Sequence, residues 1–347
     1  MGTNRQVGSF LINDIIIKIA SNEQKWSRSV LSYLSMPTSS GLKAGQKVLT
    51  LDLYLCTEKE LDIALPLPGE EYFRLEKTLL VDRPILNRTY RKEGKLWINY
   101  EGFGRFMLNY RNNMAVAAFL SDSGISQVYA DIALGYNPLL GLLAGHGYNA
   151  IHASCAQVGG KGVLFTGDGG SGKSTSAYAM LCSGHPVLAD DRILLKEDYS
   201  VEESPSRISP GSFSAYSISD VMKLKQEAID SFYPEAKEID FLHQVNDEYY
   251  FKATAYDGGS YLNSTKIDYL MVFEKTGRPE SRLEKINPSR VVGDLFPVTM
   301  SNYEAATMEK KFSFLVNFLE SVECFKVYFG TDMKQFVGTI ENLVHES

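Results

Sequence analysis

Apolar and polar positions follow two different patterns along the chain. Up to about residue 122, short apolar or alternating runs are separated by polar, turn-like stretches, and several runs are rich in aromatic residues. Such runs are typical of β-strands. We therefore predict a β-rich region over residues 1–124. Its expected strands lie within 8–19, 47–56, 71–81, 94–102, 104–111 and 114–121.

From residue 125 onward the apolar residues take helical spacing. An apolar helix is predicted between Ile125 and His146, interrupted near Pro138, and a strand follows at 150–154. A chain of 347 residues has room for one large domain or two moderate ones. We place the start of a second domain between residues 125 and 150 and assign 125–347 to it. The remaining pattern predicts helices over 217–232, 308–322 and 333–344, and strands over 248–256, 268–275 and 324–330.

One stretch of the second region has the order strand, loop, helix, strand. Val163–Thr166 is an apolar run typical of a buried strand, and Ser174–Leu181 predicts a helix. A second apolar strand, 186–189, then runs into two adjacent carboxylates, Asp190 and Asp191. The loop between the first strand and the helix therefore lies close in sequence to a pair of acidic side chains.

That loop, GDGGSGKS, is a complete G-x-x-x-x-G-K-[ST] phosphate-binding motif. Glycines let the backbone approach a ligand, so that its N–H groups and the positive end of the helix face phosphates. Lys173 would add positive charge at the β and γ phosphates, and the Ser174 hydroxyl would be a Mg²⁺ ligand. A chance glycine-rich turn is the alternative, and the flanking strand and helix argue against it. The predicted nucleotide-binding residues are Gly167, Asp168, Gly169, Gly170, Ser171, Gly172, Lys173, Ser174 and Thr175.

The carboxylates of Asp190 and Asp191 follow the loop after a single helix. Adjacent residues of a strand point to opposite faces, so the two carboxylates cannot share one role. One could bind the water shell of Mg²⁺ while the other accepts the proton of an acceptor hydroxyl. A solvated strand end is the alternative.

Composition narrows the choice of partners. A net charge of −7 without a basic cluster argues against nucleic-acid binding. No apolar run approaches the ~20 residues needed to span a bilayer, and the first ten residues lack a secretory pattern. We expect a cytoplasmic protein with no nucleic-acid or membrane partner. Four cysteines lack metal-ligand spacing and are expected to be free thiols: Cys56, Cys155, Cys182 and Cys324.

A resemblance to the HPr kinase/phosphorylase family rests on four stretches in chain order. They are Ile151–Ser154, the loop with its flanks (GVLFTGDGGSGKST), Gly184-His185 and Leu188–Asp191. The family is related to phosphoenolpyruvate carboxykinase, and the resemblance covers about residues 150–195. It implies an α/β fold with a mixed-sheet P-loop catalytic core, here preceded by the N-terminal β-rich region, and ATP and Mg²⁺ as cofactors.

The same resemblance implies roles for individual residues. A histidine at the place of His152 lies beside the aspartate and helps to set its charge. The resemblance favours a general base within the aspartate pair and metal contact from the other member. We favour Asp191 as the base, with Asp190 then facing His152 or the metal, and which of the two is the base stays open. The predicted metal ligands are Ser174 and Asp190, and the predicted catalytic residues are Asp191, Asp190, His152 and Lys173.

Two features depart from the family pattern. The glycine- and arginine-rich segment that the family uses downstream for the reverse reaction is not found, and the N-terminal region differs. The chain is more similar to divergent HPr kinase-like proteins beside ribosomal peptide pathways, including lasso-peptide tailoring kinases that phosphorylate a serine of a precursor peptide. Candidates for clamping phosphate charge are Arg192, Arg207 and Arg290, with surface salt bridges as the alternative.

We therefore predict an ATP-dependent serine kinase acting on a peptide or protein acceptor, to whose binding residues 1–124 could contribute. A nucleotide-binding regulatory protein without catalysis is one alternative, and a small-molecule kinase of the same fold is another. A homo-oligomeric assembly also stays open.

Overall fold

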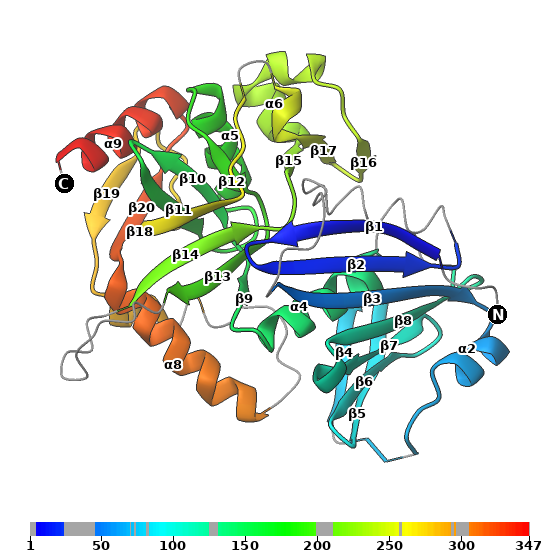
Figure 1. Ribbon diagram of the computed structural model, residues 1–347. Coiled ribbons are helices and arrows are strands. Elements are labelled where there is room, and N and C mark those ends of the chain that lie inside the picture. The colour runs from blue at the N-terminus through cyan, green and yellow to red at the C-terminus, as the bar shows by residue number, and fades with distance from the viewer. Residues whose placement is uncertain are drawn as a thin grey trace, which may run out of the picture. The chain divides into compact units, whose positions relative to one another are not determined.

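The computed structural model of the protein describes residues 5–23, 46–69, 71–72, 74–80, 83–124, 131–198, 211–256, 259–292, 295 and 305–346. By its internal contacts the chain divides into two compact units, Met1–Tyr148 and Asn149–Ser347. Each unit contains its own sheet (Figure 1). Within the described residues, no helix combines the length and the apolar character needed to cross a membrane.

The first unit is built on an eight-stranded mixed sheet with the strand order β1-β2-β3-β8-β7-β6-β5-β4. Strand β3 pairs in parallel with both β2 and β8, and the other neighbours are antiparallel. The predicted N-terminal β-rich region is thus confirmed. The strands are β1 (Arg5–Ile12), β2 (Ile15–Ser21), β3 (Lys47–Cys56), β4 (Arg74–Leu80), β5 (Arg83–Lys92), β6 (Lys95–Tyr100), β7 (Gly104–Asn109) and β8 (Met114–Leu120).

Helical segments complete this unit, namely α2 (Glu58–Ala64), the 3-10 turn η1 (Tyr110–Asn112), the π-helix η2 (Asp131–Tyr136) and α4 (Asn137–Ala144). Helix α4 packs so closely on β7 that a Cβ at Gly141 would lie 2.5 Å from Leu108 Cδ1. The Tyr148 hydroxyl accepts a hydrogen bond from Asn13 and donates one to Asp14 (3.2 Å each). These contacts keep 131–148 with the first unit, so the structure divides inside the expected range 125–150 but later than residue 124.

The second unit contains a nine-stranded mixed sheet, which confirms the predicted mixed-sheet α/β class. Its main path is β12-β10-β11-β18-β14-β13-β9, and β20 joins β18 to β19. Strands β11, β18 and β20 are parallel, and the remaining pairs are antiparallel. The strands are β9 (Asn149–Ile151), β10 (Ser154–Val158), β11 (Lys161–Thr166), β12 (Val187–Ala189), β13 (Ile193–Asp198), β14 (Ser212–Ser217), β18 (Ser264–Lys275), β19 (Arg282–Lys285) and β20 (Glu323–Phe329).

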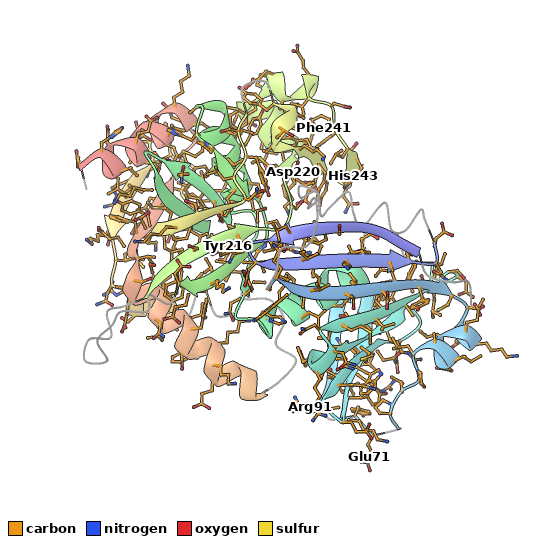
Figure 2. All side chains as sticks on the ribbon, in the orientation of Figure 1. Glu71, Arg91, Tyr216, Asp220, Phe241 and His243 are labelled. Carbon is orange, nitrogen blue, oxygen red and sulfur yellow. The ribbon has the colours of Figure 1, made fainter. Side chains whose placement is uncertain are left out.

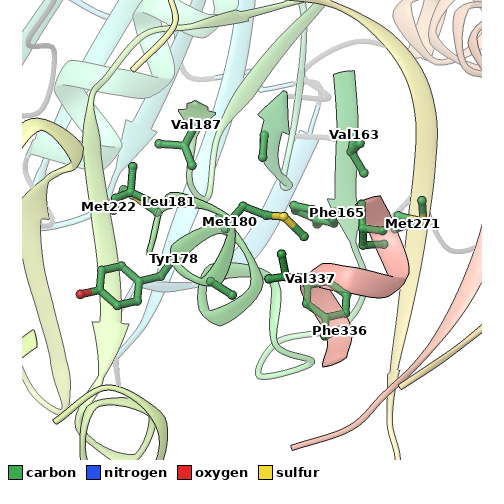
Figure 3. Close-up of a cluster of buried hydrophobic side chains, with 14 of the residues drawn as sticks. Val163, Phe165, Tyr178, Met180, Leu181, Val187, Met222, Met271, Phe336 and Val337 are labelled. Carbon is green, nitrogen blue, oxygen red and sulfur yellow. The ribbon is translucent and has the colours of Figure 1, made fainter. Parts of the chain in front are cut away.

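Helices cover both faces of this sheet because its central strands are apolar on both sides. Successive side chains of β11 point to opposite faces. Phe165 joins the cluster under α5 (Lys173–Cys182) and α9 (Met333–Glu346), shown in Figure 3. Leu164 joins the cluster under α8 (Ala305–Ser321). A buried side chain of this size stabilises the fold by about 1.5–3 kcal/mol, so the strand that enters the loop is anchored from both sides.

A small three-stranded sheet is inserted between β14 and β18. It has the order β15-β17-β16, all antiparallel; Figure 2 labels His243 in β16, Asp220 just before β15 and Phe241 in the segment before β16. The His243 ring stacks on Tyr250 with centroids 4.6 Å apart. Its elements are β15 (Val221–Lys225), α6 (Gln226–Phe232), η3 (Pro234–Glu238), β16 (His243–Val245), β17 (Glu248–Lys252) and η4 (Ala253–Ala255), and η5 (Pro288–Arg290) follows β19.

The prediction of one helix over 217–232 is wrong, because 217 ends β14, 221–225 forms β15 and only 226–232 is helical. Two serine hydroxyls bind the local backbone: Ser217 Oγ accepts from the Ser219 N–H (3.0 Å), and Ser219 Oγ accepts from the Val221 N–H (3.1 Å). Such bonds compete with a helical start. Met222 and Leu224 are then buried from a strand. The predicted strand over 248–256 likewise ends at Lys252.

Candidate functional site

The glycine loop connects the buried end of β11 to the first residue of α5, as the sequence predicts. Three of its glycines have positive φ: Gly167 (+143°), Gly170 (+77°) and Gly172 (+112°). At Gly172 a Cβ would lie 2.5 Å from Phe329 Cε1. Position 172 therefore requires glycine both for its backbone conformation and for its packing against β20.

Lys173 turns back onto the loop that precedes it. Its Nζ donates hydrogen bonds to the carbonyl oxygens of Gly167 (2.8 Å) and Asp168 (2.9 Å), and the residue is buried. Burial lowers the pKa of Lys173, and the charge of Asp191 opposes that effect. Within the described residues, the buried hydroxyl of Ser171 has no hydrogen-bond partner. The loop thus holds a cation and a spare hydroxyl at the start of α5, which suits an anionic ligand.

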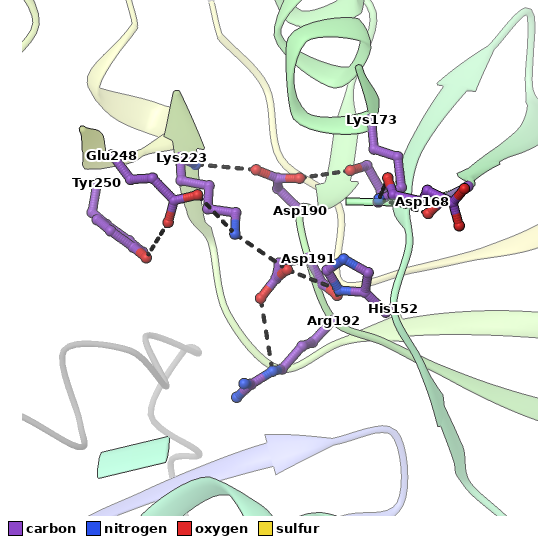
Figure 4. A network of polar contacts seen from close by, with 11 residues as sticks. His152, Asp168, Lys173, Asp190, Asp191, Arg192, Lys223, Glu248 and Tyr250 are labelled. Atoms are coloured by element: carbon purple, nitrogen blue, oxygen red, sulfur yellow. Dashed lines mark hydrogen bonds and ion pairs between the residues drawn. The ribbon is translucent and has the colours of Figure 1, made fainter. Parts of the chain in front are cut away.

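His152 contacts Asp191, and the expectation that Asp190 faces His152 is wrong. His152 Nδ1 lies 2.9 Å from Asp191 Oδ1 and 2.9 Å from the Asp191 carbonyl oxygen. Asp191 has φ +77°, in the left-handed region. The Asp191 carboxylate points toward His152 (Figure 4).

Asp190 points into the protein. Its Oδ1 accepts a hydrogen bond from Ser154 Oγ (2.6 Å), and its Oδ2 accepts one from the Lys223 backbone N–H (3.1 Å). Burial raises the pKa of Asp190, although Lys223 and Ser154 oppose the effect. The two neighbouring aspartates thus lie in different surroundings, although β12 ends at Ala189 and neither aspartate is in the strand from which this difference was predicted.

Asp191 is held in its ionised form by its neighbours. Burial alone would raise the pKa of Asp191, but the hydrogen bond from His152 and the charges of Lys223 and Arg192 outweigh it, so the pKa falls well below its usual range. Lys223 Nζ lies 3.4 Å from Oδ1, and Arg192 Nε lies 3.8 Å from Oδ2. A negative charge therefore persists here at neutral pH.

A cavity of about 460 Å³, here called the loop cavity, brings these groups together. Lys173, Ser174 and Thr175 line it from the loop and α5, and His152 and Asp191 line it from the aspartate side. Sequence reasoning missed the contribution of the small sheet, because Lys223 of its edge strand β15 fell within a predicted helix. The lining residues from that part of the chain include Lys223, Glu248, Ala228 and Phe232.

The residues expected to hold Mg²⁺ fit that role unequally. Ser174 lines the loop cavity, whereas Asp190 does not, and both carboxylate oxygens of Asp190 already accept hydrogen bonds. Asp191 is the ionised carboxylate on the same cavity as Ser174. Across the described ranges no three histidine, cysteine or acidic side chains are grouped for a metal ion. A metal ion here would therefore need phosphate oxygens among its ligands.

A second cavity of about 680 Å³ shares Gly169, Gly170 and Lys275 with the loop cavity. Asp168, Ser171 and Arg290 line it. Of the arginines considered as phosphate clamps, Arg290 is thus in this cavity and Arg192 pairs with Asp191, while Arg207 lies outside the described residues.

The second unit thus combines a mixed α/β fold, a loop with the G-x-x-x-x-G-K-[ST] motif and an ionised aspartate on one cavity. The chain matches no protein-family model. It is 44% identical over 45 residues to the HPr kinase/phosphorylase of Lactobacillus delbrueckii subsp. bulgaricus, covering 13% of this chain and 14% of that one. The Lactobacillus acidophilus HPr kinase/phosphorylase is 40% identical over 60 residues (16% and 19%). The putative HPr kinase/phosphorylase 2 of Oceanobacillus iheyensis is 45% identical over 47 residues (14% and 15%).

These matches confirm the resemblance to HPr kinase/phosphorylases, and the chain spans less than one fifth of the length of each of these curated relatives. Among solved structures, the Hpr(Ser) kinase/phosphatase from Coxiella burnetii is similar with a TM-score of 0.27 and 14% identity, covering 57% of this chain and 94% of that one.

Proposed function

We propose that the protein is an ATP-dependent kinase that transfers the γ-phosphoryl group of ATP to a hydroxyl of a peptide or protein acceptor. One observation carries this proposal. The ionised carboxylate of Asp191 lines the same cavity as the phosphate-loop residues Lys173 and Ser174. An ionised carboxylate on the cavity that holds the phosphate-loop residues is the group that phosphoryl transfer requires as proton acceptor for an incoming hydroxyl.

In this proposal, the amide groups of 167–174 and Lys173 bind the phosphates. Lys173 is held only by two loop carbonyls, so it can exchange them for phosphate oxygens. Ser174 would hold Mg²⁺ together with phosphate oxygens, and the ion would neutralise charge on the β and γ phosphates. The apolar side of the loop cavity, from Ala228 and Phe232, offers a surface for the nucleoside.

The transfer itself requires little covalent chemistry from the protein. The acceptor oxygen forms a bond to the γ-phosphorus, the bond from that phosphorus to the bridging oxygen breaks, and ADP leaves with the electron pair. Asp191 accepts the proton of the acceptor hydroxyl, and His152 holds the carboxylate in place. Positioning and charge stabilisation supply most of the rate in such reactions.

A serine of a peptide is the acceptor that we propose. The names of the relatives describe kinases of the protein HPr, and the resemblance to lasso-peptide tailoring kinases favours a precursor peptide. The experiment is to incubate the protein with ATP, Mg²⁺ and candidate peptides, among them precursor peptides encoded nearby, and to measure their masses. A gain of one phosphate on a serine is expected with the native protein and not with Asp191→Asn. Phosphate found only on a small molecule, or ATP binding without any transfer, would replace this proposal with one of the two alternatives.

A further inference from the structure

We propose that Lys223 binds the γ-phosphoryl group during transfer. It would thus have the phosphate-clamping role for which the sequence analysis considered only arginines. This inference rests on the proposed kinase function and adds a catalytic residue to it. Lys223 belongs to β15 of the small inserted sheet, a different sheet from the one that carries the loop.

The position of Lys223 relative to Asp191 supports this role. Lys223 Nζ lies 3.4 Å from Asp191 Oδ1, and both residues line the loop cavity together with Lys173. A phosphoryl group in transit has to lie between the loop and the carboxylate that receives the acceptor proton. The ammonium group of Lys223 is therefore beside the place where negative charge develops.

The other cations of the region are less suitable. Lys225 lines the cavity, but its side chain is 50% exposed, so solvent screens its charge. Lys275 is exposed at the edge that the two cavities share. Arg192 lies on the far oxygen of Asp191 and is not among the lining residues. Lys223, with a side chain 23% exposed, combines burial with access to the cavity.

The Lys223 ammonium is attracted by two carboxylates without being locked to either. Its distances to Asp191 Oδ1 (3.4 Å) and Glu248 Oε1 (3.6 Å) exceed those of a short charge-assisted hydrogen bond, about 2.7–2.9 Å. An ammonium group has three N–H donors. At least one donor therefore remains for a phosphate oxygen, and a phosphate carries enough charge to draw the ammonium group further into the cavity.

The backbone of Lys223 is also fixed relative to the aspartate pair. Its N–H donates to Asp190 Oδ2 (3.1 Å). Asp190, the neighbour of Asp191 in the chain, therefore holds β15 in place. On the other side, the Tyr250 hydroxyl donates to Glu248 Oε2 (3.0 Å), which leaves Oε1 facing the lysine. Glu248 and Tyr250 act through Lys223 and are positioning residues (Figure 4).

The test compares Lys223→Met and Lys223→Arg with the control Lys237→Met. Lys237 is exposed, pairs with Asp230 at 2.6 Å and does not line the loop cavity. The measurements are kcat and KM for ATP with the phosphorylated acceptor as product, the affinity for ATP by direct titration, and the melting temperature. Removal of one preorganised charge-stabilising donor typically lowers kcat by about 10²–10³-fold.

We expect Lys223→Met to lose kcat to that extent while its ATP affinity changes less than about fivefold. Lys223→Arg should recover at least about one tenth of native kcat, since it restores the charge. Native kcat in Lys223→Met would overturn the inference, and so would a loss confined to ATP affinity. A folded Lys223→Arg protein no better than Lys223→Met would overturn the charge-based role. Absence of transfer by the native protein would instead refute the proposed function itself.

Discussion

A single ring nitrogen of His152 contacts Asp191 twice, through the carboxylate oxygen Oδ1 and through the carbonyl oxygen, at 2.9 Å in both cases. Both of these oxygens are acceptors, so Nδ1 carries the proton that they share. The histidine thereby fixes the side chain and the backbone of the residue proposed as the base. The contact between His152 and Asp191 should therefore affect both the stability of the fold and the rate of phosphoryl transfer. Substitutions at the two residues can measure these effects separately.

Replacement of His152 by alanine should slow transfer without preventing nucleotide binding. The Asp191 carboxylate would lose the donor that orients it, and misplacement by about 1 Å costs roughly 10²-fold in rate. We expect kcat for acceptor phosphorylation to fall by about that factor, with a near-native affinity for ATP. The matched control is His185→Ala, whose histidine pairs with Glu341 at 2.8 Å and lines neither cavity. An equal loss in both variants would contradict the assignment.

Two substitutions of Asp191 distinguish its effect on phosphoryl transfer from its effect on the stability of the fold. The residue has φ +77°, a conformation that asparagine tolerates and alanine disfavours by roughly 1–2 kcal/mol. Both variants lose the charge that His152, Lys223 and Arg192 stabilise, but Asp191→Ala carries the backbone cost as well and should unfold at a lower temperature than Asp191→Asn. Both variants should lose phosphoryl transfer. Measured transfer by Asp191→Asn at the native rate would exclude a carboxylate base at this position.

Gly172 tests whether the loop binds the nucleotide. A Cβ at this position would lie 2.5 Å from Phe329 Cε1, and φ is +112°. We expect Gly172→Ala to weaken ATP binding by at least about tenfold in a titration with ATP and Mg²⁺. Gly338 in α9 is the matched control, because no atom lies within 4 Å of its added Cβ. Gly338→Ala should bind ATP normally and gain about 0.5–1 kcal/mol of stability. If Gly172→Ala bound ATP as strongly as the native protein, the assignment of the loop as the nucleotide site would be refuted.

Lys311 in α8 should make folding stability depend on pH. It is 5% exposed, and burial lowers its pKa from 10.5 to about 8. Between these two values the unfolded chain holds the proton and the folded chain has lost it, so the free energy of unfolding rises with pH. Below about pH 8 both states are protonated and the dependence ends. Lys311→Met should therefore gain stability relative to the native protein at pH 7 compared with high pH, because it removes the cost of a buried charge.

Urea unfolding of the native protein and Lys311→Met at pH 7 and pH 9.5 measures this effect. The stability difference between the two proteins should shrink at the higher pH, because the native lysine is then largely neutral in the fold. Lys310→Met, which changes the exposed neighbour, should show no such difference. A difference independent of pH would mean that Lys311 acts through packing alone.

Several features of this protein could be read from local sequence. The spacing of GDGGSGKS and the apolar runs beside it predicted the strand, loop and helix at Gly167–Ser174 because each depends on neighbours in the chain. The alternation within short aromatic runs predicted the β-rich first unit for the same reason. The different surroundings of Asp190 and Asp191 were also predicted, but the reason given was wrong: β12 ends at Ala189, and Asp191 has φ +77°, so the two residues are not part of a strand.

Contacts between distant parts of the chain could not be predicted from local sequence patterns. The segment 217–232 contains apolar residues at both strand and helix spacing, and its pairing with β17 and the serine bonds to the backbone decided the outcome. Lys223 reached the cavity only through that pairing.

The sequence alone thus determined the chemistry of the loop and the presence of two carboxylates near it. The tertiary structure decided how those carboxylates differ. Asp190 is buried against Ser154 and the backbone of β15, and Asp191 lies among His152, Lys223 and Arg192. The reason is physical: the ionisation of a carboxylate depends on its burial and on the charges around it. Those charges come from His152 after β9, Arg192 between β12 and β13 and Lys223 in β15, and much of this set is brought together only by the fold.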